Sequence, residues 1–144
     1  GATYRRPDGM ILIDKQKCIG CGKCIDACPY GVRSFDPFVK AGGDPTKQAA
    51  DKCDMCVHRV DNGVEPSCVN TCQGRARIYG DLNDPNSEVS KLVKEHNLAK
   101  DANVLLPEEG TNPHVFYIDP DNMLKRLYTQ RKKGKLDHFV DQII

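Results

Sequence analysis

The chain has 144 residues, a length that fits one domain, and its charges nearly cancel at a formal net charge of +1. A net charge so close to zero creates no global field that would attract nucleic acid, so no nucleic-acid partner is predicted. No apolar stretch reaches the roughly eighteen residues that a transmembrane helix needs, so no direct membrane span is predicted. The distinctive feature of the composition is its eight cysteines.

The chain before residue 36 is predicted to form a strand, a loop, a short helix and a second strand. Residues 10–13 are a short apolar run, which is typical of a strand. Residues 24–28 are predicted as a short helix. Residues 32–35 alternate apolar and polar side chains, which favours a returning strand. The loop between the first strand and the helix holds the first cysteines.

The first group of cysteines has the spacing C-x2-C-x2-C-x3-C-P and consists of Cys18, Cys21, Cys24 and Cys28. This spacing is that of the bacterial ferredoxin run for a 4Fe–4S cluster. Gly20 and Gly22 lack Cβ atoms, so the loop can curl tightly and backbone N–H groups can approach the sulfurs. In ferredoxins with two clusters the fourth cysteine of the run ligates the other cluster. The motif therefore calls for a second set of ligands.

The second group consists of Cys53, Cys56, Cys68 and Cys72. We therefore predict two 4Fe–4S clusters. Cluster one is expected to be held by Cys18, Cys21, Cys24 and Cys72, and cluster two by Cys28, Cys53, Cys56 and Cys68. A faint repeat supports the assignment of the last cysteine of each group to the cluster of the other group. Residues 24–28 and 68–72 both read Cys, branched aliphatic, Asp or Asn, small residue, Cys.

Disulfides and zinc are the two other uses of so many cysteines. Disulfides are typical of small secreted domains, but cysteines two residues apart are poor partners for one another. Two structural zinc sites would also use C-x2-C pairs, but such sites present two pairs rather than one run of four cysteines ending in proline. Iron–sulfur clusters are the favoured interpretation.

The chain after the first group is predicted to be less regular. Residues 36–52 contain two prolines and two glycines and are predicted as an irregular connector, with one helical turn at 46–50. The later predicted elements are a strand at 77–80, a helix opened by residues 84–88, strands at 104–106 and 115–118, and a last helix from residue 123. Five cations near the cysteines form either a solvated basic surface or a field that raises a cluster's potential: Lys23, Arg33, Arg59, Arg75 and Arg77.

The predicted fold class is α+β, with a bacterial-ferredoxin-like domain of two 4Fe–4S clusters and pseudo-twofold symmetry in residues 1–80. Residues 81–144 contain no cysteine and are predicted to be an extension of helices and short strands that docks on a partner. No triad, phosphate loop or acid pair stands out, so no catalytic residue is predicted. One-electron transfer is the only chemistry that the residues support.

Most of the chain resembles the iron–sulfur electron-transfer subunits of the molybdopterin oxidoreductases, such as dimethyl sulfoxide, polysulfide, tetrathionate and arsenate reductases. The resemblance is carried by DKQKCIGC at 14–21, CPYGVR at 28–33, ADKCDMCVHR at 50–59, GVEPSCV at 63–69, IYGDLNDP at 78–85 and EGTNPHVFY at 109–117. Members of that family carry four clusters on two ferredoxin-like halves. The resemblance thus implies that this chain corresponds to the second half of such a subunit. The other clusters are then expected in the same polypeptide or in another chain, and a naturally short two-cluster subunit is the remaining alternative.

The resemblance further implies a role between other proteins. The partners it implies are a catalytic subunit with a molybdenum or tungsten pterin, a quinone-linked membrane anchor or a soluble carrier, and another two-cluster half. Such a complex would be associated with the periplasmic or cytoplasmic face of a membrane, with catalysis on the partner subunit. The alternative is a free 2×4Fe–4S ferredoxin that diffuses between enzymes. The long extension after residue 80 argues against that alternative.

Overall fold

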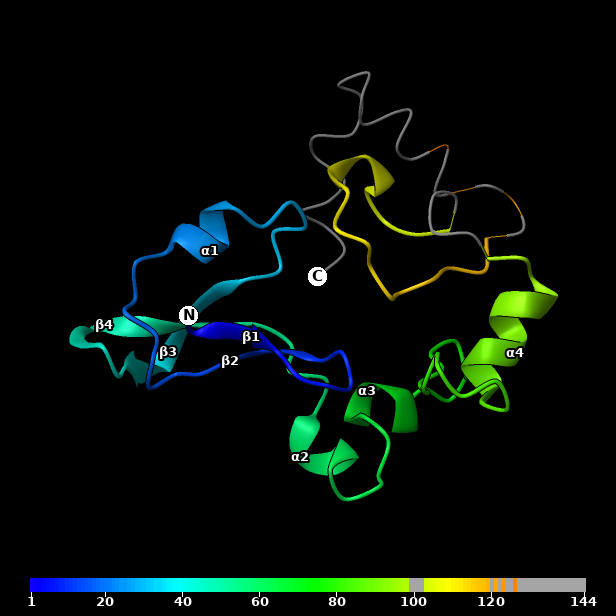
Figure 1. The fold of residues 1–144 in the computed structure, drawn as a ribbon, viewed down its shortest axis with the longest axis horizontal. Coiled ribbons are helices and arrows are strands. Elements are labelled where there is room, and N and C mark those ends of the chain that lie inside the picture. Colours follow the sequence, from blue (N-terminus) through cyan, green and yellow to red (C-terminus); the bar gives the residue numbers. More distant parts are fainter. Residues whose placement is uncertain (99–102, 120, 122, 124–125, 127–144) are drawn as a thin grey trace. The chain divides into compact units, whose positions relative to one another are not determined.

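The computed structural model describes residues 1–98, 103–119, 121, 123 and 126. The chain divides into two compact units, Gly1–Tyr79 and Gly80–Ile144. All eight cysteines belong to the first unit. Figure 1 shows the elements of both units in chain order.

The first unit opens with a two-stranded ribbon of β1 (Thr3–Arg5) and β2 (Ile11–Ile13). The strands are antiparallel, with Thr3 opposite Ile13. The turn between them is closed by a hydrogen bond from the Arg6 N–H to the Met10 carbonyl at 2.8 Å. The predicted strand at residues 10–13 is confirmed.

A β-hairpin follows where the sequence predicted an irregular connector. Strand β3 (Ser34–Ala41) pairs antiparallel with β4 (Asp44–Asp51), so the helical turn predicted at 46–50 is wrong. The Gly42–Gly43 pair makes the tight turn, which is a known hairpin signal. Pro37 is accommodated because the register shifts between Phe35 and Lys40 and each strand has an unpaired edge. The predicted strand at 32–35 is confirmed only as the beginning of β3.

The apolar core of the first unit is small and forms around a cysteine. Its buried members are Cys18, Ala41, Ala49 and Ala50, and Ala2, Ile13 and Cys24 pack against them. Many larger apolar side chains are exposed, including Phe38 at 91%. The core therefore serves mainly to seat the loop that carries Cys18.

Three one-turn helices lie among the remaining cysteines: α1 (Lys23–Asp26) carries Cys24, α2 (Val57–Val60) begins directly after Cys56, and α3 (Ser67–Asn70) carries Cys68. Helix α1 confirms the short helix predicted at 24–28. The strand predicted at 77–80 is wrong, because these residues are described as irregular. Among the described residues, each of the two sheets has only two strands, so residues 77–80 have no strand to pair with.

The second unit contains α4 (Glu88–Glu95) and a 3-10 turn, η1 (Pro107–Glu109). Helix α4 confirms the predicted helix, and the Ser87 hydroxyl caps it by accepting the Ser90 N–H at 3.2 Å. The strands predicted at 104–106 and 115–118 are wrong. Leu106 has φ +48, which directs the chain into η1 rather than along a strand. The predicted last helix lies almost wholly outside the described residues.

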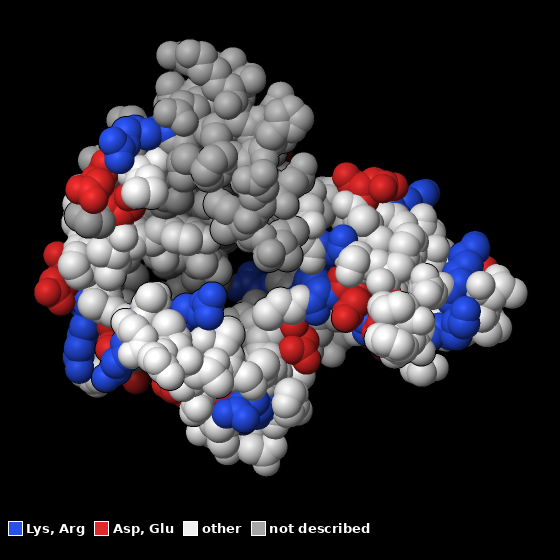
Figure 2. Space-filling view, turned by 180° about the vertical axis from the view of Figure 1, so that it is seen from behind, with Lys and Arg blue, Asp and Glu red and all other residues white. Residues whose placement is uncertain are grey.

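None of the helices in the described ranges has the length and apolar character needed to cross a membrane. On the face seen in Figure 2, basic and acidic side chains of the described residues are interspersed. This distribution agrees with the near-zero net charge of the sequence.

Candidate metal centre

The eight cysteines are free thiols with very different exposure. Cys18 is buried, whereas Cys21, Cys53 and Cys68 are exposed. The other four, which are Cys24, Cys28, Cys56 and Cys72, are half-buried. Thiolates are the ligands of iron–sulfur clusters, so the donor set suits such a cofactor.

The first loop directs backbone N–H groups at its buried sulfur. The Sγ of Cys18 accepts hydrogen bonds from the N–H of Gly20 and from the N–H of Ala50, both at 3.4 Å. N–H donors of this kind stabilise negative charge on sulfur, and hydrogen bonds to the sulfurs tune a cluster's potential. The loop and β4 thus direct two N–H donors at the Cys18 sulfur although its side chain is buried.

The β3–β4 hairpin holds this loop in place through close backbone approach. A Cβ on Gly20, which has φ +63, would lie 2.5 Å from the Lys47 Cβ and 2.9 Å from the Gln48 carbonyl. Within the hairpin turn, the Gly43 N–H donates to the Cys18 carbonyl at 2.9 Å. The glycines therefore allow loop and hairpin to approach more closely than side chains would permit.

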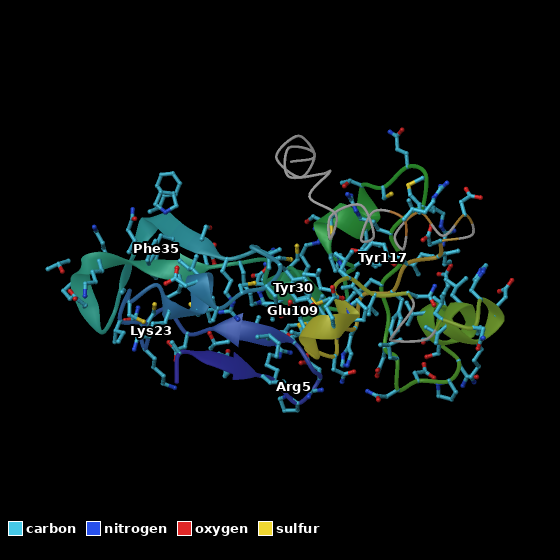
Figure 3. All side chains as sticks on the ribbon, turned by 90° about the horizontal axis from the view of Figure 1, so that it is seen from above. Arg5, Lys23, Tyr30, Phe35, Glu109 and Tyr117 are labelled. Carbon is cyan, nitrogen blue, oxygen red and sulfur yellow. The ribbon has the colours of Figure 1, made fainter. Side chains whose placement is uncertain are left out.

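Helix α1 begins beside the same hairpin. Its N-cap, Gly22, has φ +75, and a Cβ there would lie 3.3 Å from the Phe35 ring. Figure 3 shows Phe35 of β3 and Lys23 of α1 at the same end of the first unit. The predicted role of Gly20 and Gly22 in shaping the loop is therefore supported by their backbone angles and contacts.

Cys28 follows α1 in an environment that favours its thiolate. Burial by itself raises the pKa of the Cys28 thiol. The N–H donors of Val32, Tyr30 and Gly31 and the charge of Arg33 lower this pKa by more than burial raises it, so the pKa lies below its ordinary value. A lowered thiol pKa favours metal binding.

The second cysteine segment has an unusual backbone. Met55 and Cys56 both have positive φ, +57 and +51, which is uncommon for residues other than glycine. The turn directs the Met55 N–H at the Cys53 Sγ, at 3.4 Å, and the Cys56 N–H at the Asp54 carboxylate, at 2.8 Å. Backbone conformations of this kind cluster at ligand-binding sites.

Cys68 lies on α3, and Cys72 follows it as Cys28 follows α1. The Cys72 Sγ accepts the Ala76 N–H at 3.3 Å. The pKa of the Cys72 thiol is lowered, first by the Ala76 and Arg77 N–H donors and also by the Arg77 charge. The local surroundings of Cys28 and Cys72 are thus alike: each follows a one-turn helix, and each has downstream N–H donors and an arginine.

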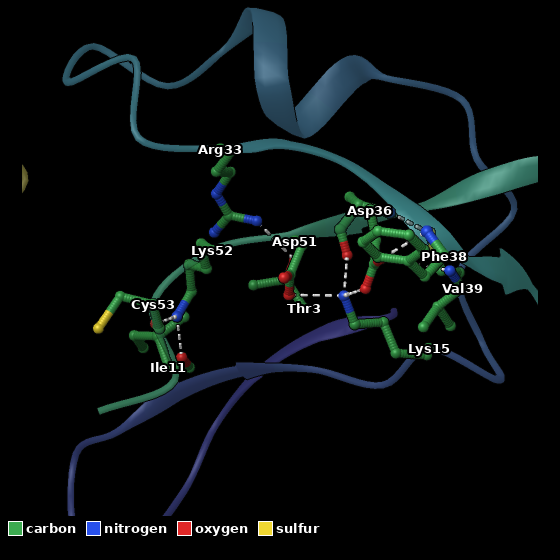
Figure 4. A network of polar contacts seen from close by, with 12 residues as sticks. Thr3, Ile11, Lys15, Arg33, Asp36, Phe38, Val39, Asp51, Lys52 and Cys53 are labelled. Atoms are coloured by element: carbon green, nitrogen blue, oxygen red, sulfur yellow. Dashed lines mark hydrogen bonds and ion pairs between the residues drawn. The ribbon is translucent and has the colours of Figure 1, made fainter. Parts of the chain in front are cut away.

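A network of polar contacts joins the ribbon, the hairpin and the second cysteine segment (Figure 4). Lys15 donates to the Asp51 carboxylate at 2.6 Å and to the Ala50 carbonyl at 2.9 Å. Lys52 donates to the carbonyls of Ile11 and Cys53. Both lysines stand close before a cysteine in the sequence, but neither is among the cations predicted to act on a cluster.

The predicted cations have different surroundings. The charges of Arg33 and Arg77 act on Cys28 and Cys72. In contrast, Arg59 donates through its Nε to the Glu65 carbonyl at 2.8 Å, which secures the loop after α2.

The structure does not gather the predicted ligands into compact sets. In the described part of the chain, no three or more His, Cys, Asp or Glu side chains form a group that could hold a metal ion. The division of the eight cysteines between two clusters therefore stays a prediction. The features that fit a cluster are local: free thiols, N–H groups directed at sulfur, and loops shaped by positive φ.

Residues 1–82 match the family model described as the 4Fe-4S dicluster domain. The chain belongs to this family. The dicluster match covers all eight cysteines and both cysteine segments. The family is therefore one whose cysteines bind iron–sulfur clusters and not zinc.

Three known proteins that are similar to this dicluster chain are named as subunits of reductases. It is 43% identical over 122 residues to a subunit of the tetrathionate reductase of Salmonella typhimurium, covering 84% of this chain and 44% of that protein. It is 41% identical over 146 residues to a putative dimethyl sulfoxide reductase iron-sulfur subunit of Halobacterium salinarum, covering 94% and 54%. An arsenate respiratory reductase iron-sulfur subunit of a Shewanella species is 36% identical over 158 residues, covering 82% and 66%.

The predicted resemblance to iron–sulfur reductase subunits is confirmed by these relatives. The chain spans about half the length of the first two relatives and about two thirds of the third.

Proposed function

We propose that this chain carries electrons through two 4Fe–4S clusters as part of the iron–sulfur subunit of a molybdopterin oxidoreductase. The observation that carries the proposal is the dicluster match over residues 1–82, within which backbone N–H groups point at the sulfurs of Cys18, Cys53 and Cys72. When bound, the clusters supply one-electron transfer. The residues of the chain hold the thiolates, stabilise their charge and set the spacing of the two cysteine segments.

The proposed ligand sets are those predicted from the spacing. Cluster one takes Cys18, Cys21, Cys24 and Cys72, and cluster two takes Cys28, Cys53, Cys56 and Cys68. The matching surroundings of Cys28 and Cys72 support this exchange and the pseudo-twofold symmetry that it implies.

Replacement of Cys72 by serine tests the ligand sets. Cys72 would tie the second segment to cluster one, so Cys72→Ser is expected to remove cluster one and to lower thermal stability, because ligation contributes much of the folding free energy of small metal domains. Met55→Leu, a change between the ligands Cys53 and Cys56, is the control and should keep both clusters. Full iron content and unchanged thermal stability in Cys72→Ser would contradict the assignment.

The proposed place of the chain is between other redox proteins. The names of the relatives and the sequence resemblance support a molybdenum or tungsten pterin subunit as the catalytic partner, and a membrane anchor or soluble carrier on the other side. Catalysis is assigned to the partner. Because the chain spans about half of two relatives, a second two-cluster half is a further proposed neighbour.

Purification of the native material under anaerobic conditions tests this place. The chain should elute with a large subunit that contains pterin, and mass spectrometry should identify that subunit and any further iron–sulfur half. Elution of the chain alone, at its own size and with both clusters, would refute the complex and leave the diffusible ferredoxin as the better function.

We further propose that residues 1–80 are the two-cluster domain and residues 81–144 an extension that docks on a partner. Val115 and Ile118 are 60% and 47% exposed, which leaves apolar surface to cover. Amide hydrogen exchange in residues 89–98 and 103–118 should slow when the partner is present. Equal exchange rates with and without it would rule out docking by this segment.

A further inference from the structure

Two cations lie beside the cysteines assigned to cluster two and are held there by the N-terminal ribbon. The Arg33 guanidinium donates to the Thr3 hydroxyl of β1 at 3.0 Å. The Lys52 ammonium donates to the Ile11 carbonyl of β2 and, at 2.9 Å, to the Cys53 carbonyl. Figure 4 shows the two side chains next to one another, close to Cys53. Each strand of the ribbon thus holds one of two neighbouring cations, β1 through Thr3 and β2 through Ile11.

The partners of these two cations are neutral. Within the described ranges, neither Arg33 nor Lys52 has a carboxylate at ion-pair distance, whereas four other cations do: Arg6, Lys15, Lys17 and Lys47. A hydroxyl and two carbonyls hold the position of a cation without cancelling its charge. The charges of Arg33 and Lys52 therefore remain available to act on a nearby anion.

The acids nearest to Lys52 are already engaged. Asp51 accepts the Lys15 ammonium at 2.6 Å, and Asp54 accepts the Cys56 N–H at 2.8 Å. Asp54 remains a negative charge between Cys53 and Cys56, and it opposes the two cations. Arg33, Lys52 and Asp54 by themselves sum to one positive charge beside two of the proposed ligands, while Lys15, which is shared between Asp51 at 2.6 Å and Asp36 at 3.5 Å, leaves that neighbouring group with one negative charge.

We infer that Arg33 and Lys52, positioned by β1 and β2, raise the reduction potential of the cluster held by Cys28 and Cys53. A 4Fe–4S cluster gains one electron on reduction and no bond is made or broken, so fixed positive charge stabilises the reduced form more than the oxidised form. This inference rests on the proposed function, because it requires that cluster two is bound.

Midpoint potentials measured by redox titration with paramagnetic resonance detection test the inference. The material is the full protein that contains this chain, purified anaerobically. Lys52→Gln and Arg33→Gln should each lower one midpoint and leave the others unchanged, and the double variant should lower the same midpoint further. Lys52→Arg keeps the charge and should retain the wild-type value.

Two further variants serve as controls. Lys40→Gln removes the same charge near the far end of β3, about 20 Å of strand from Arg33, and should leave unchanged the midpoint that Lys52→Gln lowers. Asp54→Asn keeps the acceptor for the Cys56 N–H but removes the negative charge, so it should raise the midpoint that Lys52→Gln lowers.

Each outcome decides between defined alternatives. Unchanged midpoints in Lys52→Gln and Arg33→Gln at full iron content would overturn the inference while leaving the proposed function intact. If Lys52→Gln or Arg33→Gln loses iron, the midpoint potentials of Asp54→Asn and Lys52→Arg test the inference instead. An Asp54→Asn midpoint equal to that of the wild type then overturns the inference. A wild-type protein without two reducible clusters in this chain would overturn the proposed function itself.

Discussion

Substitution of Gly20 by alanine isolates the contact between the first cysteine loop and the β3–β4 hairpin. Two effects add at this position. Alanine at φ +63 costs about 1–2 kcal/mol for the left-handed conformation. Its Cβ would also lie 2.5 Å from the Lys47 Cβ and 2.9 Å from the Gln48 carbonyl, and overpacking of this kind costs about 1–3 kcal/mol. Gly20→Ala is therefore expected to lower the free energy of unfolding by about 2–5 kcal/mol.

Gly63 provides a matched control. It has φ +71, but a Cβ there meets nothing within 4 Å, so Gly63→Ala should cost only the conformational term of about 1–2 kcal/mol. The assay is urea denaturation of both variants, followed by far-UV circular dichroism and by the visible absorbance of the clusters. Because the hairpin seats Cys18, Gly20→Ala should also lose cluster absorbance at lower urea. Equal destabilisation of the two variants would refute the packing of the loop against β4.

Three smaller perturbations test other contacts of the fold. The pKa of Asp44 is lowered to about 2 by the Thr46 hydroxyl, the Lys47 ammonium and the Thr46 N–H. The stabilisation of the hairpin by the Asp44 carboxylate is therefore present above about pH 4 and is lost as the pH falls through about 2. The measurement is the pH titration of the Asp44 carboxyl carbon chemical shift, and a midpoint near the ordinary value of 3.8 would contradict this prediction. Ser87→Ala should destabilise α4 by about 0.5–2 kcal/mol through loss of the N-cap, whereas Ser87→Asp should retain it, as judged by amide exchange in residues 88–95. Arg6→Gln removes a bidentate ion pair with Asp61 and should lower the melting temperature at low salt but not near 1 M salt, because salt screens the ion pair. A melting temperature that is still lowered in high salt would contradict an electrostatic role of Arg6.

The sequence predicted the elements whose signals are local. Residues 10–13 and the helix after Ser87 were predicted correctly, because a short apolar run and a capped amphipathic pattern are determined within a few residues. The cysteine spacing, combined with Gly20 and Gly22, likewise predicted a curled loop with N–H groups at sulfur. That loop is present at Cys18.

The hairpin was missed because its determinants are not local. Pro37 and Pro45 argued against strands, and Ala49 and Ala50 have low strand propensity. In the structure these alanines are buried against Cys18, where a small side chain is needed, and the prolines lie in a sheet of only two strands. Burial against a distant cysteine loop thus determines the structure of residues that look irregular in isolation.

The strands predicted at 77–80 and 115–118 failed for a related reason. An apolar alternation forms a strand only where another strand is available to pair with it. Tyr117 donates its N–H to the Asn103 carbonyl at 2.8 Å, but neither the segment at 103–106 nor the segment at 115–118 is a strand. Which cysteines share a cluster likewise depends on tertiary contacts. The cysteine spacing predicts the two ligand sets but does not determine them.

The N-terminal ribbon connects chain segments that the proposed cluster two requires to be close. Its contacts with Arg33 and Lys52 reach the residues that follow Cys28 and precede Cys53. Its loop also binds α2, through the Arg6–Asp61 ion pair. The β3–β4 ladder pairs Ser34 with Asp51, which brings the segment that follows Cys28 next to the segment that precedes Cys53, and cluster two requires that this proximity is kept. The ribbon meets that requirement with polar contacts that involve no cysteine side chain, so it can position the two segments independently of ligation. Its contribution to cluster assembly is therefore separable from that of the ligands.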